Sequence, residues 1–364
     1  MPVPLRYCPD MDEVLARLRL LYERRTQDRV FAVMGLPSAA LRDFAAQHPA
    51  GFCEYPDPGE RARFWDAYLA EHTPLHDDAI PSAYLSEMDQ GLYGGLAGGD
   101  ARFLCDPSTG WISSMVAPIL PGGESLEGLP TKPDTLWMSR YQRQMEVFVR
   151  AAQGKFTVSH FILIDALNFA FELFGATRTY ELLLERPELV TQVIDYAFAL
   201  NVAVQEAFFR HVSLLEGGTC STMAQWLPGG QIVSESVDPF HMTSVAYFER
   251  WGREPVERIL GRFDGGVLHV HGNGRHLLEA VSTIRGLKAL YLGDDKGFPL
   301  AFDVLPEIKR RTGDLPLAVT VEYDGFREAL RRHHLSGGVL YIVKEAPSLD
   351  EANRCMDLVR AYRV

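Results

Sequence analysis

Apolar and polar positions divide the chain into two regions of different character. Residues 1 to about 80 are polar and interrupted by proline, with helical spacing in MDEVLARLRLLYERR and GERARFWDAYLAEH. We expect residues 1–79 to form an N-terminal helical extension with one short strand at VFAVMG. From residue 80 onward, short apolar runs that are typical of strands alternate with longer segments of helical spacing.

The apolar runs predict seven strands after residue 80, at 80–87, 156–165, 212–218, 266–272, 289–294, 315–322 and 338–345. An eighth strand is expected within 100–120 or within 219–237. Strands that alternate with helices and are apolar on both faces favour a parallel sheet covered by helices. A count near eight favours a closed (β/α)8 TIM barrel over residues 80–364. No glycine-rich nucleotide motif follows a predicted strand, so the sequence gives no indication of a dinucleotide or P-loop site.

The charge balance narrows the classes of partner. The chain has 36 Lys and Arg against 48 Asp and Glu, a net charge of −12, which argues against nucleic acid and against an anionic membrane surface. No apolar run reaches the roughly 20 residues that span a bilayer. Five cysteines without a CxxC pair indicate reduced thiols. We therefore expect a cytoplasmic protein that acts on a small molecule and is able to form a homodimer.

Ionisable groups follow the predicted strands, where the catalytic loops of a barrel lie. The expected acid, base or orienting groups are Asp165, Asp238 and Glu322. The expected substrate contacts are Glu87, Arg140, His241, Asp294, Tyr323 and Lys344. For each single residue there is a structural alternative, because strands end where water begins and polar residues are common there.

The pair in LHVHGN (268–273) is the sharpest local feature. The two-residue period of a strand places His269 and His271 on the same side, and neutral imidazole is a common ligand of zinc-type ions. Glu345 is the expected third ligand, which would give a set of two histidines and one carboxylate with open coordination positions. In the alternative interpretation, one histidine is packed and the other binds an anionic substrate group directly.

Two further segments have structural alternatives. The loop 229–244 would orient substrate through His241, whereas capping and turn formation explain Ser236 and Asp238 equally well. Arg140 could bind a carboxylate, while the aromatic residues beside it have the spacing of a packed helix face. The segment HTPLHDD (72–78) is expected to be a solvated turn before the first strand.

Four segments carry a resemblance to a known family: FELFGATRTYELLLERPELVTQVIDY, the Ser-x-Asp-Pro-Phe loop with its following helix (236–250), HVHGNGRHLLEAV and LSGGVLYIVKEAPSLDEANRCMDLVRAY. In these segments the chain resembles the uroporphyrinogen decarboxylase superfamily. That superfamily includes the decarboxylase and the cobalamin-dependent methyltransferases. The resemblance covers roughly residues 80–364, and it implies one β/α barrel with an N-terminal helical elaboration.

Departures from the family pattern shape the expected chemistry. The decarboxylase's PxWxMRQAGRY segment is absent from residues 1–60, which argues against haem biosynthesis. The methyltransferases bind zinc through H-x-C and a second cysteine after the final GG strand. Here His269 matches the histidine, His271 replaces the first cysteine, and Lys344 or Glu345 stands near the second. Without thiolate ligands, a metal ion bound here would be a harder Lewis acid than the zinc ion of those methyltransferases.

The resemblance therefore implies metal-assisted methyl transfer from a small polar substrate to a corrinoid protein. A divalent ion, with zinc favoured, would be held by His269, His271 and Glu345. The corrinoid would be carried by a separate partner protein, because the chain has no DxHxxG module. Two alternatives are a metal-independent decarboxylase or lyase, with Arg140, Arg143 or Lys344 neutralising carboxylates, and a non-catalytic ligand-binding barrel.

Overall fold

The computed structural model describes residues 4–48, 55–88, 90–106, 111–122, 125–159, 162–163 and 166–364. The strands of its main sheet are β1 (Val30–Met34), β6 (Ile162–Leu163), β9 (Val233–Ser236), β10 (Gly266–Val270), β11 (Leu287–Leu292), β12 (Leu317–Glu322) and β13 (Val339–Lys344). They are ordered β1-β13-β12-β11-β10-β9-β6, and every neighbouring pair is parallel. This arrangement confirms the predicted parallel α/β architecture.

Three two-stranded units accompany the main sheet. Strands β2 (Ser82–Tyr84) and β5 (Thr157–Ser159) form a parallel pair. Strands β3 (Ala101–Asp106) and β4 (Trp111–Val116) are antiparallel, as are β7 (Gly218–Ser221) and β8 (Gln225–Pro228). Residues 100–120 therefore contribute an antiparallel pair, and the additional parallel strand is β9, inside the other predicted window.

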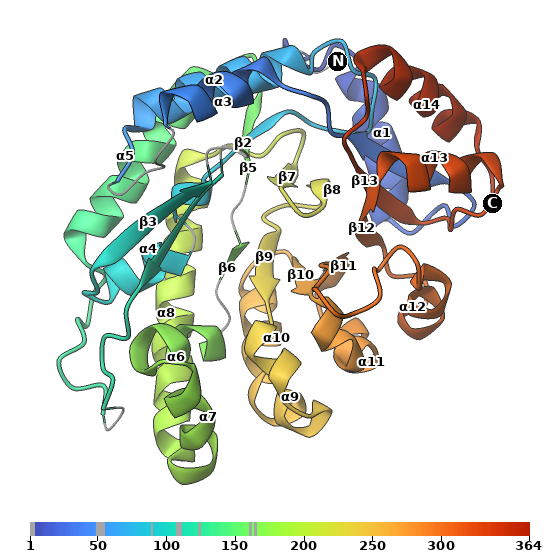
Figure 1. Cartoon of the computed structure of the whole chain (residues 1–364). Helices are drawn as coiled ribbons and strands as arrows, with labels where there is room; N and C mark the ends of the chain where they lie inside the picture. Colours follow the sequence, from blue (N-terminus) through green and yellow to red (C-terminus); the bar gives the residue numbers. More distant parts are fainter. Residues whose placement is uncertain are drawn as a thin grey trace.

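Helices surround the strands (Figure 1). The first part of the chain supplies α1 (Met11–Tyr22), α2 (Ala39–Gln47), α3 (Pro58–Glu71), α4 (Gln90–Leu96) and α5 (Thr135–Ala152). The middle supplies α6 (Ala166–Phe174), α7 (Ala176–Glu185), α8 (Pro187–His211), α9 (Val245–Trp251) and α10 (Arg253–Arg262). The last part supplies α11 (Leu278–Ser282), α12 (Leu305–Thr312), α13 (Tyr323–Arg331) and α14 (Leu349–Ala361). Short 3-10 turns are η1 (Ser86–Met88), η2 (Asp238–Met242) and η3 (Gly272–Leu277).

None of the described helices is long and apolar enough to cross a membrane.

The order of the strands approaches a ring. Strand β5 pairs with β2, and β6 follows β5 along the chain and pairs with β9. Between β1 and β2, however, no backbone ladder forms among the described residues, and we call this edge the seam. The prediction of a fully closed ring is therefore corrected to a barrel-like sheet that is open at the seam.

Two neighbouring carboxylates cover the strand edge at the seam. Asp78 Oδ2 accepts the N–H of Ala32 at 2.9 Å, and Asp77 Oδ2 accepts the N–H of Met34 at 2.8 Å. The Asp78 backbone N–H also donates to the Ala32 carbonyl at 2.9 Å. Arg17 of α1 neutralises Asp78 through two contacts, of 2.5 and 3.0 Å. The expectation of a solvated turn at 72–78 was wrong for these two residues, because unpaired backbone groups at the edge need buried acceptors.

The core has an outer and an inner part. The outer part lies between strands and helices. The inner part joins inward-facing residues of several strands, among them Val267, Ala289, Ala318 and Leu340. Leu18 of α1 and Trp226 of β8 belong to the same inner cluster. Helix α1 and the β7–β8 pair therefore fill the end of the sheet where the strands begin, which leaves the opposite end for chemistry.

Two boundary expectations change. Residues 212–218 are not a strand of the main sheet, because α8 extends to His211 and the next strand, β7, is antiparallel to β8. Strand β1 lies within the segment 1–79 yet pairs with β13 in the main sheet. The N-terminal segment is thus a structural part of the sheet as well as a helical elaboration.

Candidate metal centre

Strand β10 places His269 on the inner face of the sheet. Val267, two residues earlier, belongs to the inner core, and the two-residue period carries His269 to the same side. His269 pairs in register with Tyr291 of β11, and the two rings have centroids 5.3 Å apart. His269 is partly exposed, whereas its neighbours in the strand are buried. The predicted inward orientation of this imidazole is therefore present.

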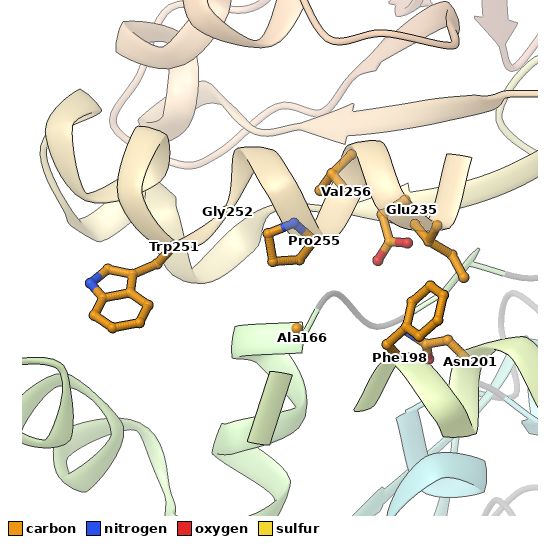
Figure 2. Close-up of a pocket in the computed structure, with 9 residues that line it drawn as sticks. Ala166, Phe198, Asn201, Glu235, Trp251, Gly252, Pro255 and Val256 are labelled. Carbon is orange, nitrogen blue, oxygen red and sulfur yellow. The ribbon is translucent and has the colours of Figure 1, made fainter. Parts of the chain in front are cut away.

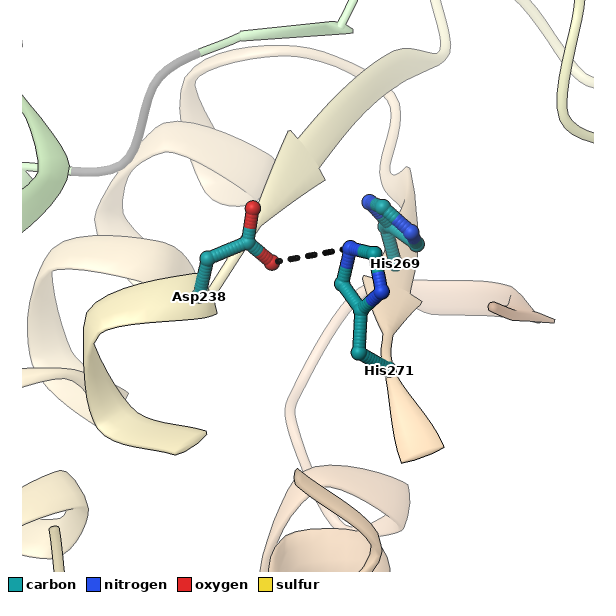
Figure 3. Close-up of side chains that lie close together, drawn as sticks. All are labelled: Asp238, His269 and His271. Atoms are coloured by element: carbon teal, nitrogen blue, oxygen red, sulfur yellow. Dashed lines mark ion pairs between the residues drawn. The ribbon is translucent and has the colours of Figure 1, made fainter. Parts of the chain in front are cut away.

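Three side chains converge at the carboxyl end of β10 (Figure 3). Asp238, His269 and His271 each offer one ligand atom, and these atoms all lie within 4.8 Å of one another. Asp238 Oδ1 lies 4.0 Å from His271 Nε2, and the two imidazole centroids are 4.2 Å apart. Two atoms that share one zinc ion at about 2 Å each lie up to roughly 4 Å apart, so the Asp238–His271 pair is at this limit and the set would close slightly around an ion.

Asp295, in the loop after β11, orients His271. Its Oδ1 lies 3.0 Å from His271 Nδ1, and its Oδ2 accepts the backbone N–H of Asn273 at 3.1 Å. A carboxylate can only accept a hydrogen bond, so Nδ1 carries the proton in this pair. The Nε2 lone pair of His271 is then directed at Asp238, as in histidine ligands that are held by an outer carboxylate.

His241 lies behind the cluster and is almost completely buried. Its Nδ1 is 3.7 Å from Asp238 Oδ1, and its ring is 5.6 Å from that of His271. Two glycines keep the space that these rings occupy. A Cβ at Gly274 would lie 2.1 Å from His241 Cδ2, and one at Gly293 would lie 3.0 Å from both His269 Nε2 and His271 Nδ1.

The electrostatics favour neutral imidazoles at His269 and His241. Burial, together with the nearby His271, lowers the pKa of His269 to about 3 and the pKa of His241 to about 4. Burial raises the pKa of Asp238 to about 6, against the opposing influence of His271. The Asn273 N–H and His271 hold the pKa of Asp295 below its usual value although burial opposes them. At neutral pH the cluster thus offers the imidazole lone pair of His269 and, at Asp238, a carboxylate that a cation would stabilise.

The carboxylate of this cluster comes from Asp238, and the predicted ligand Glu345 is not in it. Glu345 follows β13 in a left-handed conformation, with φ +56°, and lines a cavity on the seam side together with Lys344. The physical reason is the ring order: β13 is separated from β10 by β12 and β11, whereas η2 follows β9, directly beside β10. A sequence without spatial order could not distinguish these carboxylates.

Several other predicted site residues have structural partners. Glu87 is fully buried, forms an ion pair with Arg61 and accepts from Gln144 Nε2 at 2.7 Å, so it is withdrawn from substrate. The Arg140 guanidinium lies 4.9 Å from the centre of the Trp137 ring, and Trp137 and Tyr141 are buried, as the spacing of a packed helix face predicted.

The remaining predicted residues lie on other loops. Asp294 accepts from the Ala301 N–H at 2.7 Å and from Arg275 at 3.2 Å, so it supports the loop beside the cluster. Tyr323 is buried and its hydroxyl lies 3.4 Å from the Glu351 carbonyl of α14. Glu322 is exposed at the end of β12. Asp165 lies outside the described residues.

A buried acidic group also lies on the outer face of the sheet. Glu235 of β9 points into a small cavity between β9 and the helices, near Phe198 and Asn201 (Figure 2). The cavity measures about 10 Å³, which is room for about one water molecule. This cavity is too small for a substrate, so Glu235 is best explained as part of the packing between β9 and α8.

Comparison with known proteins supports the architecture. No protein-family model matches the chain, and no curated protein matches its sequence. Among solved structures, a methyltransferase from Methanosarcina mazei is similar over 96% of this chain and 98% of its own, with a TM-score of 0.62 and 12% sequence identity. At this identity the likeness shows a shared fold, along nearly the full length of both chains.

Proposed function

We propose that this chain is an enzyme that transfers a methyl group from a small polar molecule with the help of a divalent metal ion, most simply zinc. The observation that carries the proposal is the convergence of Asp238, His269 and His271 at the open end of the sheet. The fold shared with a methyltransferase supports the direction of the proposal. A corrinoid on a separate protein is the proposed methyl acceptor, in keeping with the resemblance to cobalamin-dependent methyltransferases.

The residues present fit a metal ion. Asp238 Oδ1 is buried and has no hydrogen-bond partner among the described residues, which is costly for a carboxylate oxygen without a cation. His271 keeps Nε2 available because Asp295 holds its Nδ1. Two histidines and one carboxylate leave coordination positions open for a substrate atom.

The chain's own groups would prepare this site. When bound, the ion would supply Lewis acidity that polarises the atom bearing the methyl group. Asp295 fixes the orientation of His271, and Gly274 leaves the space in which His241 packs. The buried imidazole of His241 limits access of water to one side of Asp238. The Tyr291 ring beside His269 gives the substrate side of the site an aromatic wall.

The alternative of a metal-independent decarboxylase is less well supported. It required Arg140, Arg143 or Lys344 to neutralise substrate carboxylates at a common site. Arg140 lies over the Trp137 ring, and Arg143 is exposed and lies 3.9 Å from Glu146. Lys344 lies on the seam side, away from the cluster.

The proposal is tested first by metal binding. Protein dialysed against a chelator is titrated with Zn²⁺ by calorimetry, alongside His269→Ala, Asp238→Asn and the control His334→Ala, an exposed histidine in the turn after α13. We expect one ion per chain for wild type and control, and at least roughly 100-fold weaker binding for the two cluster variants, because each loses a ligand. Equal affinity in all four proteins would refute the metal site.

Methyl transfer is tested separately. The zinc-loaded protein is incubated with reduced cobalamin and a panel of methylated amines, thiols and alcohols, and formation of methylcobalamin is followed by absorbance. We expect turnover with at least one class of donor and its loss in His269→Ala. Zinc binding without turnover on any donor would favour the non-catalytic alternative.

A further inference from the structure

A large cavity lies at the seam, beside β13, which is separated by β12 and β11 from the strand that carries the metal-cluster histidines. It measures about 880 Å³ and lies among the ends of β1 and β13, helix α3 and residues 79–84. This volume is within the range of cavities that enclose a small organic ligand. None of Asp238, His269 or His271 lines it, so it is a separate place in the molecule. We call it the seam cavity.

The seam cavity crosses the sheet where the ladder is missing. Val33 and Ile80 line it and belong to the inner core, whereas Met34 and Leu69 line it and belong to the outer core. A cavity with walls from both cores passes between β1 and β2. Such a passage is feasible because Asp77 and Asp78, rather than a neighbouring strand, satisfy the N–H groups of β1.

A line of partly exposed residues leads from this cavity to the metal cluster. Ile342 lines the cavity and pairs in register with Thr320 of β12. The Thr320 hydroxyl lies 3.4 Å from that of Tyr291, which pairs with His269. These four residues are partly exposed at the same level of the sheet, above the buried inner core. The inner end of the cavity therefore faces the layer that contains His269.

The lining of the cavity has a specific chemistry. Trp65, Tyr68 and several leucines give it apolar and aromatic walls. Lys344 is exposed at the end of β13 and has no ion pair within the described part of the chain. An anionic oxygen would satisfy the ammonium group of Lys344.

Most of the acidic groups at the cavity have partners within the protein. Asp77 accepts two backbone N–H groups, and Asp10 lies within 4 Å of His76 and Arg360. Glu345, which lines the cavity beside Lys344, is its only carboxylate that has no ion pair or hydrogen-bond partner among the described residues. We propose that the seam cavity binds a small molecule with an apolar chain or ring and a carboxylate end, with the carboxylate at Lys344. This site goes beyond the proposed metal-dependent activity and does not depend on it.

The test uses calorimetry on the full chain with decanoate, decanol and decyltrimethylammonium, each below its micelle concentration. We expect decanoate to bind one to one and at least about tenfold more tightly than the other two. Lys344→Ala is expected to lower decanoate affinity to that of decanol, whereas Lys132→Ala, at an exposed lysine outside the cavity, leaves it unchanged. Glu345→Gln is expected to increase decanoate affinity, because it removes a like charge.

Further variants keep the result interpretable. Leu36→Trp fills the cavity from a partly buried position and is expected to abolish binding of all three probes. His269→Ala is expected to keep decanoate binding, so that loss of metal binding and loss of this site are separate outcomes. The proposal is overturned if decanoate does not bind, if Lys344→Ala binds it as tightly as wild type, or if the cationic probe binds best.

Discussion

At the residue scale, the adjacent carboxylates Asp77 and Asp78 stand in different environments. Asp78 is neutralised by Arg17, whereas Asp77 has only backbone N–H groups as partners. Burial raises the pKa of Asp77 to about 7, and the two N–H groups oppose this shift only in part. A single residue at the seam thus changes charge within the physiological range of pH.

The raised pKa of Asp77 makes stability depend on pH in a definite direction. Between about pH 4 and pH 7 the folded state keeps the proton and the unfolded state releases it, so the free energy of unfolding falls as pH rises. This contribution is fully present below pH 4 and lost above pH 7. In Asp77→Asn, which cannot ionise, we expect this part of the decline to be absent in urea titrations at a series of pH values. A constant difference between wild type and variant from pH 4 to 7 would contradict the assignment.

At the element scale, helix α1 connects the seam with the closed end of the sheet. One face of α1 packs in the inner core through Val14, Leu18 and Leu21, and Arg17 reaches Asp78 from the same helix. Tyr22, at its last turn, donates to the Ala224 carbonyl between β7 and β8. The helix therefore fixes both the β7–β8 pair and the unpaired edge of β1.

Removing the positive charge of Arg17 should show how far the stability of the seam depends on α1. Arg17→Met leaves Asp78 as an uncompensated buried carboxylate, and we expect a loss of about 3–5 kcal/mol in the free energy of unfolding. Arg25→Met removes an exposed arginine that pairs with Glu23 at 3.4 Å and is expected to cost less than about 1 kcal/mol. Chemical denaturation of both variants checks this; similar losses in the two would show that the Arg17–Asp78 pair contributes little.

The periodic pattern was informative for elements whose partners are local. The helical spacing around Leu18 and the alternation around His269 predicted α1 and β10, because both signals depend on neighbours in the chain. The burial of Asp77 and the absence of Glu345 from the metal cluster depend on which strands are neighbours, which no local pattern encodes. Asp295 follows a predicted strand, and only the pairing of β10 with β11 places it at His271.

At the scale of the whole molecule, the metal cluster joins separate parts of the sheet. Asp238 comes from the turn after β9, the histidines from β10, and the orienting Asp295 from the loop after β11. These elements are neighbours only in the folded state, so the unfolded chain does not present the same set of ligands. Binding of an ion would therefore favour the folded protein as a whole.

Thermal unfolding should report this coupling. At a Zn²⁺ concentration about 100 times the dissociation constant, we expect the wild-type protein to gain about 2.7 kcal/mol and a higher midpoint temperature. Asp238→Asn should show little or no gain at the same concentration, because a ligand is missing. An equal rise of the midpoint in both proteins would indicate binding elsewhere.

The pairing of β1 with β13 has a consequence for biosynthesis. The first and last strands of the main sheet are neighbours, so β1 leaves the ribosome long before its partner exists. During translation α1 and the two seam aspartates can cover only the seam edge of β1, whereas its other edge stays unpaired until the final segment emerges and completes the sheet. A chain released before β13 would keep an open edge, and such an edge recruits strands from other molecules.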